Sequence, residues 1–271
     1  MSPSPRRSSR QGVPALIAAP ASIALVFLVL PLVAMLVRAP WRSLGRLLLQ
    51  SDVLSALRLS VECATAATAI SLLFGVPLAW VLARQRFPGI GAIRALVMLP
   101  LVLPPVVGGI ALLMALGRNG IVGRYLDQWF GVTLPFTTAA VVVAETFVAM
   151  PFLIVSVEGA LRAADKDIEE AAVTLGASRL TVFRRITLPS VGPSIAAGAV
   201  LCWARALGEF GATITFAGNF PGTTQTMPLQ IYEAFQLNPQ ASVALGLVLL
   251  LVAVAVLTAL RGQWLRGAAI Q

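Results

Sequence analysis

Six long apolar stretches constrain this chain more than any other feature of its sequence. Each is long enough to cross a bilayer as a helix, which takes about 20 residues. We place them at residues 15–37, 54–83, 93–116, 135–157, 191–216 and 241–260. The sequence therefore predicts an all-α membrane protein with six transmembrane helices, in which residues 15–260 form a single transmembrane domain.

Charge is scarce and lies mostly between the apolar stretches. Hydrophobic residues make up 58% of the chain and charged residues 11%, whereas about a quarter of a typical soluble domain is charged. The net charge is +9, but the basic residues form no stripe interleaved with aromatic side chains, as they would on a nucleic-acid-binding face. We therefore expect membrane lipid around the chain and no nucleic-acid partner.

The chain lacks residues that several enzyme classes need. It has no histidine, which excludes Ser-His-Asp catalysis and histidine-ligated zinc within this chain. Lys166 is the only lysine and lies in no G-x-x-x-x-G-K-[ST] loop, so the chain cannot itself be a P-loop ATPase. Cys63 and Cys202 lie in apolar stretches, where cysteine behaves as a small hydrophobic residue. The prediction is a chain that is not an enzyme and has no catalytic residue, metal site or cofactor of its own.

The placement of basic residues predicts the orientation of the chain. With the N-terminus in the cytoplasm, the inner segments carry 13 of the 20 Lys and Arg residues and the outer segments carry 6, while Arg205 lies inside the fifth stretch. This bias follows the positive-inside rule. The first stretch is too long for a cleaved signal peptide. We therefore predict cytoplasmic tails at residues 1–14 and 261–271, and we place the polar loop 158–190 in the cytoplasm.

The last outer loop, residues 217–240, contains no Lys or Arg. In its second half, Ile231, Tyr232 and Phe235 fall close to one face of a helix. We predict a short surface helix over residues 226–237.

The polar loop at 158–190 has the signals of two short helices. Carboxylates cluster between Asp165 and Glu170, where they favour a helix N-terminus. Gly176 is placed to end this first helix, and Ser178 is placed to cap a second one. Pro189 is expected to stop the second helix before the fifth apolar stretch. The pattern predicts two helices joined at a glycine elbow.

The second of these helices has an apolar side, because Leu180, Phe183 and Ile186 recur at three-residue spacing. An apolar stripe on a loop that faces water needs a cover. The stripe could pack against the ends of the chain's own spans or against another protein. Alternatively, the segment is an ordinary solvated helical loop that nothing covers. We expect the stripe to pack against the chain's own spans and the elbow at 170–176 to face a partner.

The order of residues in this loop resembles a known motif. Glu170-Ala171-Ala172 is followed after three residues by Gly176, and after nine more by Ile186-Thr187-Leu188-Pro189. This is similar to the EAA loop in permease subunits of binding-protein-dependent ABC importers. The resemblance implies a fold like that of type I ABC importer permeases, in which the two-helix loop couples to a separate ATPase subunit that binds ATP and Mg. The coupling residues that it implies are Glu170, Ala171, Ala172, Gly176, Ala177, Ile186, Leu188 and Pro189.

Ionisable residues inside an apolar stretch are costly and face either a partner or a water-filled path. Arg205 and Glu209 are four residues apart and share one helix face. They either pair and hold helices together, or border a translocation path. Glu62 and Glu145 are weaker candidates of the same kind. Nearby glycines and threonines have backbone amides and hydroxyls. A path lined by such groups could let an oxyanion through without binding it tightly. The path or gate candidates are Arg205, Gly208, Glu209, Gly211, Thr213 and Thr215.

Two further segments narrow the resemblance. "LPLVLPPVVGG" at 99–109 and "ALGEFGATITFAGNFPGTTQTMPLQIY" at 206–232 are similar to permease subunits for molybdate. That resemblance implies import of molybdate or tungstate through the bacterial plasma membrane, with a second copy of the chain, an ABC ATPase and an extracytoplasmic oxyanion-binding protein as partners. Permeases for sulfate or thiosulfate share "GEFGA" and remain an alternative. A stand-alone secondary anion transporter is another, although no repeat of charged residues in two halves supports it.

Overall fold

The computed structural model describes residues 15–268, and all regular secondary structure in this range is helical. The predicted N-terminal tail at 1–14 lies outside the described residues, and so do residues 269–271. The helices up to the first long loop are α1 (Ala15–Val37), α2 (Trp41–Leu48), α3 (Ser51–Arg84), α4 (Ile90–Val102), α5 (Pro105–Leu116), α6 (Gly123–Phe130) and α7 (Thr138–Ala163). The remainder are α8 (Lys166–Thr174), α9 (Arg179–Val182), the π-helical turn η1 (Phe183–Thr187), α10 (Leu188–Leu207), α11 (Gly211–Phe216), α12 (Met227–Leu237) and α13 (Pro239–Ala268).

Four of the six predicted spans correspond to single helices, namely α1, α3, α7 and α13. Within residues 15–268, five helices are long and apolar enough to cross a membrane, or six if the bent pair α4–α5 is counted as one span. Helix α13 runs on to Ala268, so the predicted tail that begins at residue 261 is helical at its start. The all-α membrane fold is confirmed.

The third predicted span, 93–116, is wrong as a continuous helix. Helix α4 ends at Val102 and α5 begins at Pro105, with a bend of 118° between the two axes. Pro104 and Pro105 explain the break, because neither has an N–H to continue the helical ladder and a proline pushes the residue before it into extended backbone. Leu103 has φ −64° and ψ 133°, as this rule expects.

The fifth predicted span, 191–216, is also wrong at both ends. Helix α10 stops at Leu207, and a break at residues 208–210 precedes the short helix α11. At the other end, α9 and η1 run into α10 without interruption, so Pro189 does not stop the second loop helix as predicted. Pro189 lies in the first turn of α10, where a missing N–H is tolerated.

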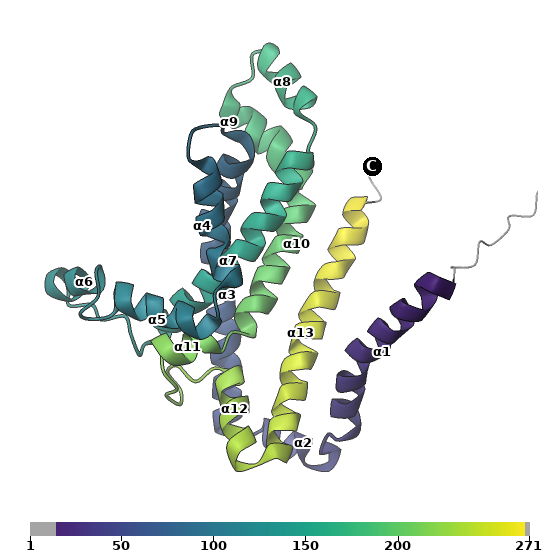
Figure 1. The fold of residues 1–271 in the computed structure, drawn as a ribbon, viewed down its shortest axis with the longest axis vertical. Coiled ribbons are helices and arrows are strands. Elements are labelled where there is room, and N and C mark those ends of the chain that lie inside the picture. Colours follow the sequence, from purple (N-terminus) through teal and green to yellow (C-terminus); the bar gives the residue numbers. More distant parts are fainter. Residues whose placement is uncertain (1–14, 269–271) are drawn as a thin grey trace, which may run out of the picture.

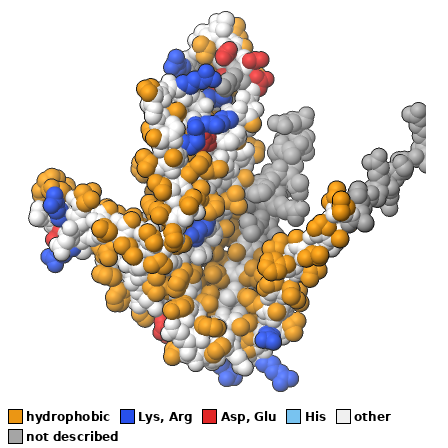
Figure 2. All heavy atoms as spheres, in the orientation of Figure 1, with side chains coloured by type: hydrophobic (Ala, Val, Ile, Leu, Met, Phe, Trp, Pro, Cys, Tyr) orange, Lys and Arg blue, Asp and Glu red, His pale blue; other side chains and the backbone are white. Residues whose placement is uncertain are grey.

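Helices α3, α7 and α10 form the packed centre of the molecule (Figure 1). Small residues on α3 and α7, including Ala64, Ala67 and Ala149, are fully buried and allow close approach of the backbones. Helix α1 lies next to α13 and away from the central helices, and the segment α5–α6 projects from the opposite side of the bundle (Figure 1). Apolar side chains cover the middle of the visible face, and charged side chains gather toward its two ends (Figure 2).

Three short helices lie in the segments predicted as outer loops. The predicted surface helix at 226–237 is confirmed as α12, with Thr226 at its N-cap. Ser60 Oγ on α3 accepts a hydrogen bond from the Met227 N–H at 2.7 Å, which anchors the start of α12 to the bundle. Helices α2 and α6 were not predicted, because each is only eight residues long and lies between apolar stretches.

Candidate functional site

The loop between α7 and α10 contains the predicted glycine elbow. Asp165 Oδ1 accepts the Asp167 N–H at 2.9 Å and caps α8. Gly176 has φ +87°, a left-handed conformation that glycine adopts without strain. Its N–H donates to the Val173 carbonyl, and the next N–H, of Ala177, donates to the Ala172 carbonyl. These two bonds are the Schellman pattern that ends a helix.

The second loop helix begins at Ser178, whose Oγ accepts the Thr181 N–H at 3.2 Å. Its apolar stripe divides in two. Phe183 packs edge-on against Trp80 of α3, with ring centroids 6.1 Å apart, as expected for a stripe that covers the chain's own spans. Leu180 instead stays exposed. The expectation therefore holds for Phe183 and fails for Leu180, which lies nearer the elbow in the chain.

The tip of the loop presents an uncovered apolar surface. Leu175, directly before the elbow glycine, is 88% exposed, and Ile168 and Val173 on α8 are also exposed. An exposed apolar cluster of this kind is typical of an interaction surface. Of the predicted coupling residues, the exposed ones are Glu170, Ala171, Gly176, Leu188 and Pro189, and the partly buried ones are Ala172, Ala177 and Ile186.

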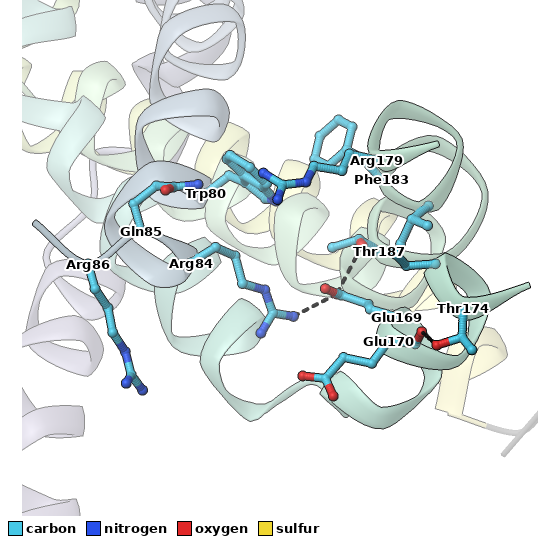
Figure 3. Close-up of a pocket in the computed structure, with 12 residues that line it drawn as sticks. Trp80, Arg84, Gln85, Arg86, Glu169, Glu170, Thr174, Arg179, Phe183 and Thr187 are labelled. Atoms are coloured by element: carbon cyan, nitrogen blue, oxygen red, sulfur yellow. Dashed lines mark hydrogen bonds and ion pairs between the residues drawn. The ribbon is translucent and has the colours of Figure 1, made fainter. Parts of the chain in front are cut away.

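Glu169 ties this loop to the bundle, a role that the sequence did not indicate. Its Oε1 accepts hydrogen bonds from Arg84 Nη2 at 2.7 Å and from Thr187 Oγ1 at 2.9 Å (Figure 3). One carboxylate thus joins α8 to the end of α3 and to η1. The sequence placed Glu169 only among the helix-capping carboxylates, because its partner Arg84 is 85 residues away.

Glu158 makes a second such junction on α7, and it too was missed. The buried carboxylate accepts a hydrogen bond from Arg94 Nε of α4 at 2.8 Å and forms an ion pair with Arg162 Nη2 at 2.7 Å. Arg94 Nη2 also donates to the Leu82 carbonyl of α3 at 3.0 Å. The spacing of Glu158 and Arg162 by four residues was the available signal.

The predicted pair of Arg205 and Glu209 forms at the end of α10. Arg205 Nη2 lies 2.6 Å from Glu209 Oε2. The other carboxylate oxygen of Glu209 accepts the Ala212 N–H at 2.8 Å, in the first turn of α11. Glu209 is only 1% exposed, whereas Arg205 keeps 26% of its side chain exposed. Both oxygens of Glu209 are therefore occupied, and the pair spans the break between the two helices.

Next to this break, α11 crosses α5 so closely that the two backbones nearly touch. A Cβ added at Gly211 would lie 2.8 Å from Pro105 Cβ, and one added at Gly109 would lie 2.8 Å from the Ala212 carbonyl oxygen. The glycines at this crossing serve close packing. The bend before α5 and the break before α11 thus meet, and broken helices that meet in this way form substrate paths in many transporters.

The other path candidates lie around this crossing. Thr213 is fully buried, and its Oγ1 has no hydrogen-bond partner among residues 15–268. Thr215 is half-buried and donates to the Gly211 carbonyl, and Gly208 is exposed. Of the weaker candidates, Glu145 is buried on α7 with Oε2 unpartnered within the same residues. Glu62 is not part of this cluster and forms an exposed pair with Arg58.

Residues 75–266 match a protein-family model described as the inner membrane component of binding-protein-dependent transport systems. The chain is 51% identical, over 86% of its own length and 88% of the relative's, to a protein of Mycobacterium tuberculosis named as a molybdenum transport system permease. It is 36% identical to a sulfate transport system permease of Salmonella typhimurium, over 78% of this chain and 77% of that one.

A solved structure shares the fold. It is a bacterial ABC transporter involved in the import of the acidic polysaccharide alginate, and its likeness covers 93% of this chain and 94% of that one, with a TM-score of 0.70. The sequence identity is 19%, so this likeness concerns the fold alone.

Proposed function

This chain belongs to the family of inner membrane components of binding-protein-dependent transport systems, and on that premise we propose that it is the membrane-spanning subunit of an ATP-driven molybdate importer. The choice of molybdate as substrate rests on sequence identity, which is 51% to a molybdenum permease and 36% to a sulfate permease. The chain is a transport subunit rather than an enzyme, and it spans the membrane several times. ATP and Mg would be bound by a partner ATPase.

We propose that the loop tip around Gly176 docks on this ATPase. The exposed apolar residues Ile168, Val173 and Leu175 form the surface that contact would bury. Glu169, held by Arg84 and Thr187, would transmit movement of the loop to α3 and, through η1, to α10. A tilt of the loop on ATP binding would then move two central helices together.

Replacing Gly176 tests this docking role. Proline cannot adopt φ +87° and has no N–H to donate to Val173, so Gly176→Pro should disrupt the elbow. We expect ATP-driven uptake and co-purification of the ATPase each to fall by roughly tenfold or more, which is the effect of about 1.4 kcal/mol lost at the interface. Asparagine tolerates the left-handed region, so Gly176→Asn should keep most of both activities. Unchanged uptake and co-purification in the proline variant would refute the docking role.

The orientation and assembly follow from the same loop. The start of α1 and the end of α13 point toward the end of the molecule that carries α8 (Figure 1), so docking on a cytoplasmic ATPase would place both termini in the cytoplasm. Helix α1 is exposed along nearly its whole length, which leaves a face that lipid or a second copy of the chain would cover. We propose two copies that enclose one path, supplied by an extracytoplasmic oxyanion-binding protein.

We place the path beside the crossing of α5 and α11. Arg205 keeps part of its side chain accessible there, and Gly208 is exposed at the break. Glu209 is bound to Arg205 and to the start of α11, so it neutralises the arginine and would allow an anion to pass without tight binding. Among residues 15–268, the Thr213 hydroxyl on α11 has no hydrogen-bond partner, and it would be free to donate to a passing anion when the crossing opens.

The substrate is tested by competition. In cells that carry the complete transport system, excess unlabelled molybdate and tungstate should abolish uptake of labelled molybdate. Sulfate at the same concentration should leave most of the uptake. Equal competition by sulfate would favour the second candidate, a sulfate or thiosulfate permease, which the 36% identity to the Salmonella protein keeps open.

A further inference from the structure

A pocket of about 650 Å³ lies between the end of α3 and the loop of α8, α9 and η1 (Figure 3). Trp80 and Phe183 form its apolar side. Three arginines, Arg84, Arg86 and Arg179, also line it, and they come from both sides of the gap between bundle and loop. This pocket is separate from the proposed path at α5 and α11.

Arg84 is the most informative of these residues. Its side chain is only 9% exposed, and only its Nη2 pairs with Glu169. Its Nε and Nη1 atoms are buried and have no hydrogen-bond partner among residues 15–268. A buried charged donor without an acceptor is costly, so two such donors on one guanidinium indicate that an acceptor belongs in the pocket.

The charges in the pocket favour an anion with several oxygens. The pocket lining holds three arginines but only two carboxylates, Glu169 and Glu170, and Glu169 is already bound to Arg84 and Thr187. Guanidinium groups donate charge-assisted hydrogen bonds to the oxygens of phosphate-like groups, and one such group has enough oxygens to accept from two arginines. We propose that this pocket binds a tetrahedral oxyanion group, which bridges Arg84 of α3 to Arg179 of the coupling loop.

Such a group has two sources. One is a free inorganic oxyanion, and the other is the phosphate of an anionic lipid, because Trp80 and the arginines lie at the end of a span, where headgroups are found. In both cases the bound group would fasten the loop to α3. The proposal does not depend on the ATPase docking or on the transported substrate.

The test uses the full chain in nanodiscs of neutral phosphatidylcholine. Inorganic phosphate should raise the thermal unfolding midpoint, and chloride at equal ionic strength should not. Arg179→Gln removes one arm of the bridge without touching the Arg84–Glu169 pair, so it should weaken the apparent phosphate affinity roughly tenfold, as the loss of one charged hydrogen bond does. Arg185→Gln is the matched control, because Arg185 is exposed on the same segment and does not line the pocket.

A second set of nanodiscs, containing phosphatidylglycerol, separates the two sources. Stabilisation by phosphate in neutral discs identifies a free oxyanion. Stabilisation by phosphatidylglycerol alone, lost in Arg179→Gln and kept in Arg185→Gln, identifies a lipid headgroup. If neither stabilises the chain, or if Arg179→Gln responds like the unmodified protein, the oxyanion site is refuted, and a partner's acidic side chain becomes the remaining acceptor for Arg84.

Discussion

Glu209→Ala is expected to lower the free energy of unfolding by about 3–5 kcal/mol and to abolish uptake, because it leaves Arg205 without its partner at a largely buried site. The substitution also removes the acceptor for the Ala212 N–H, so the first turn of α11 loses its cap. Both losses fall on the break where α10 gives way to α11. We therefore expect the variant to accumulate poorly.

The chain contains a matched control for this substitution. Arg58 and Glu62 have the same four-residue spacing and the same 2.6 Å separation between nitrogen and oxygen. Their side chains are 79% and 56% exposed, so the surrounding protein does not enclose the charge that the substitution would leave unpaired. Glu62→Ala should therefore leave accumulation and uptake close to those of the unmodified protein, as measured by quantitative immunoblotting of membranes and by molybdate uptake.

A double variant separates the two roles of Glu209. If the stranded charge of Arg205 causes most of the damage, Arg205→Ala combined with Glu209→Ala should accumulate better than Glu209→Ala alone. If the lost cap of α11 causes it, the double variant should be no better. Equal and small effects of Glu209→Ala and Glu62→Ala would contradict the burial argument altogether.

The Arg205–Glu209 pair also shows how far sequence reasoning reached. A spacing of four residues predicts a shared helix face, and the contact was confirmed. The helix end between them was not predicted, because the apolar pattern continues through Gly208 and Phe210 without a change in composition. Hydropathy reports what lies in the membrane, but it does not report where a helix inside the membrane ends.

The two-helix loop at 158–190 was predictable because its signals are local. Caps at Asp165 and Ser178 and the left-handed glycine at 176 act within a few residues, and all three were confirmed. Contacts between distant segments carry no such signal. Glu169 pairs with Arg84, which is 85 residues away in the chain, and Glu158 pairs with Arg94, which is 64 residues away. Neither pair could therefore be predicted from residue spacing.

The bend between α4 and α5 had a visible signal that hydropathy obscured. Pro104 and Pro105 lie in the middle of the apolar run 93–116, and two adjacent prolines remove two helical donors. Transmembrane helices often tolerate one proline, as α7 does at Pro151. The pair exceeds that tolerance here, and the bend brings α5 across α11.

Gly109→Ala should therefore have the second large effect, a loss of about 1–3 kcal/mol of stability with a severe fall in uptake. The added Cβ would overlap Thr215 Oγ1 and would lie 2.8 Å from the Ala212 carbonyl oxygen and 2.9 Å from Ala212 Cα. Thr215 has a side chain that can turn away, but the backbone of Ala212 cannot. Helix α11 would have to move off α5, and Glu209 would move with it.

Two other helical glycines, one on α5 and one on α4, provide a graded comparison for this prediction. A Cβ at Gly108 would meet only the ring edge of Phe147 at 3.2 Å, and a Cβ at Gly91 on α4 would meet nothing within 4 Å. Uptake and thermal stability should therefore fall in the order Gly91→Ala, Gly108→Ala, Gly109→Ala, with the first near the unmodified protein. Helix propensity alone would make all three alanines mildly stabilising. A flat series would show that the α5–α11 crossing adapts, and that the path does not depend on its close backbone contact.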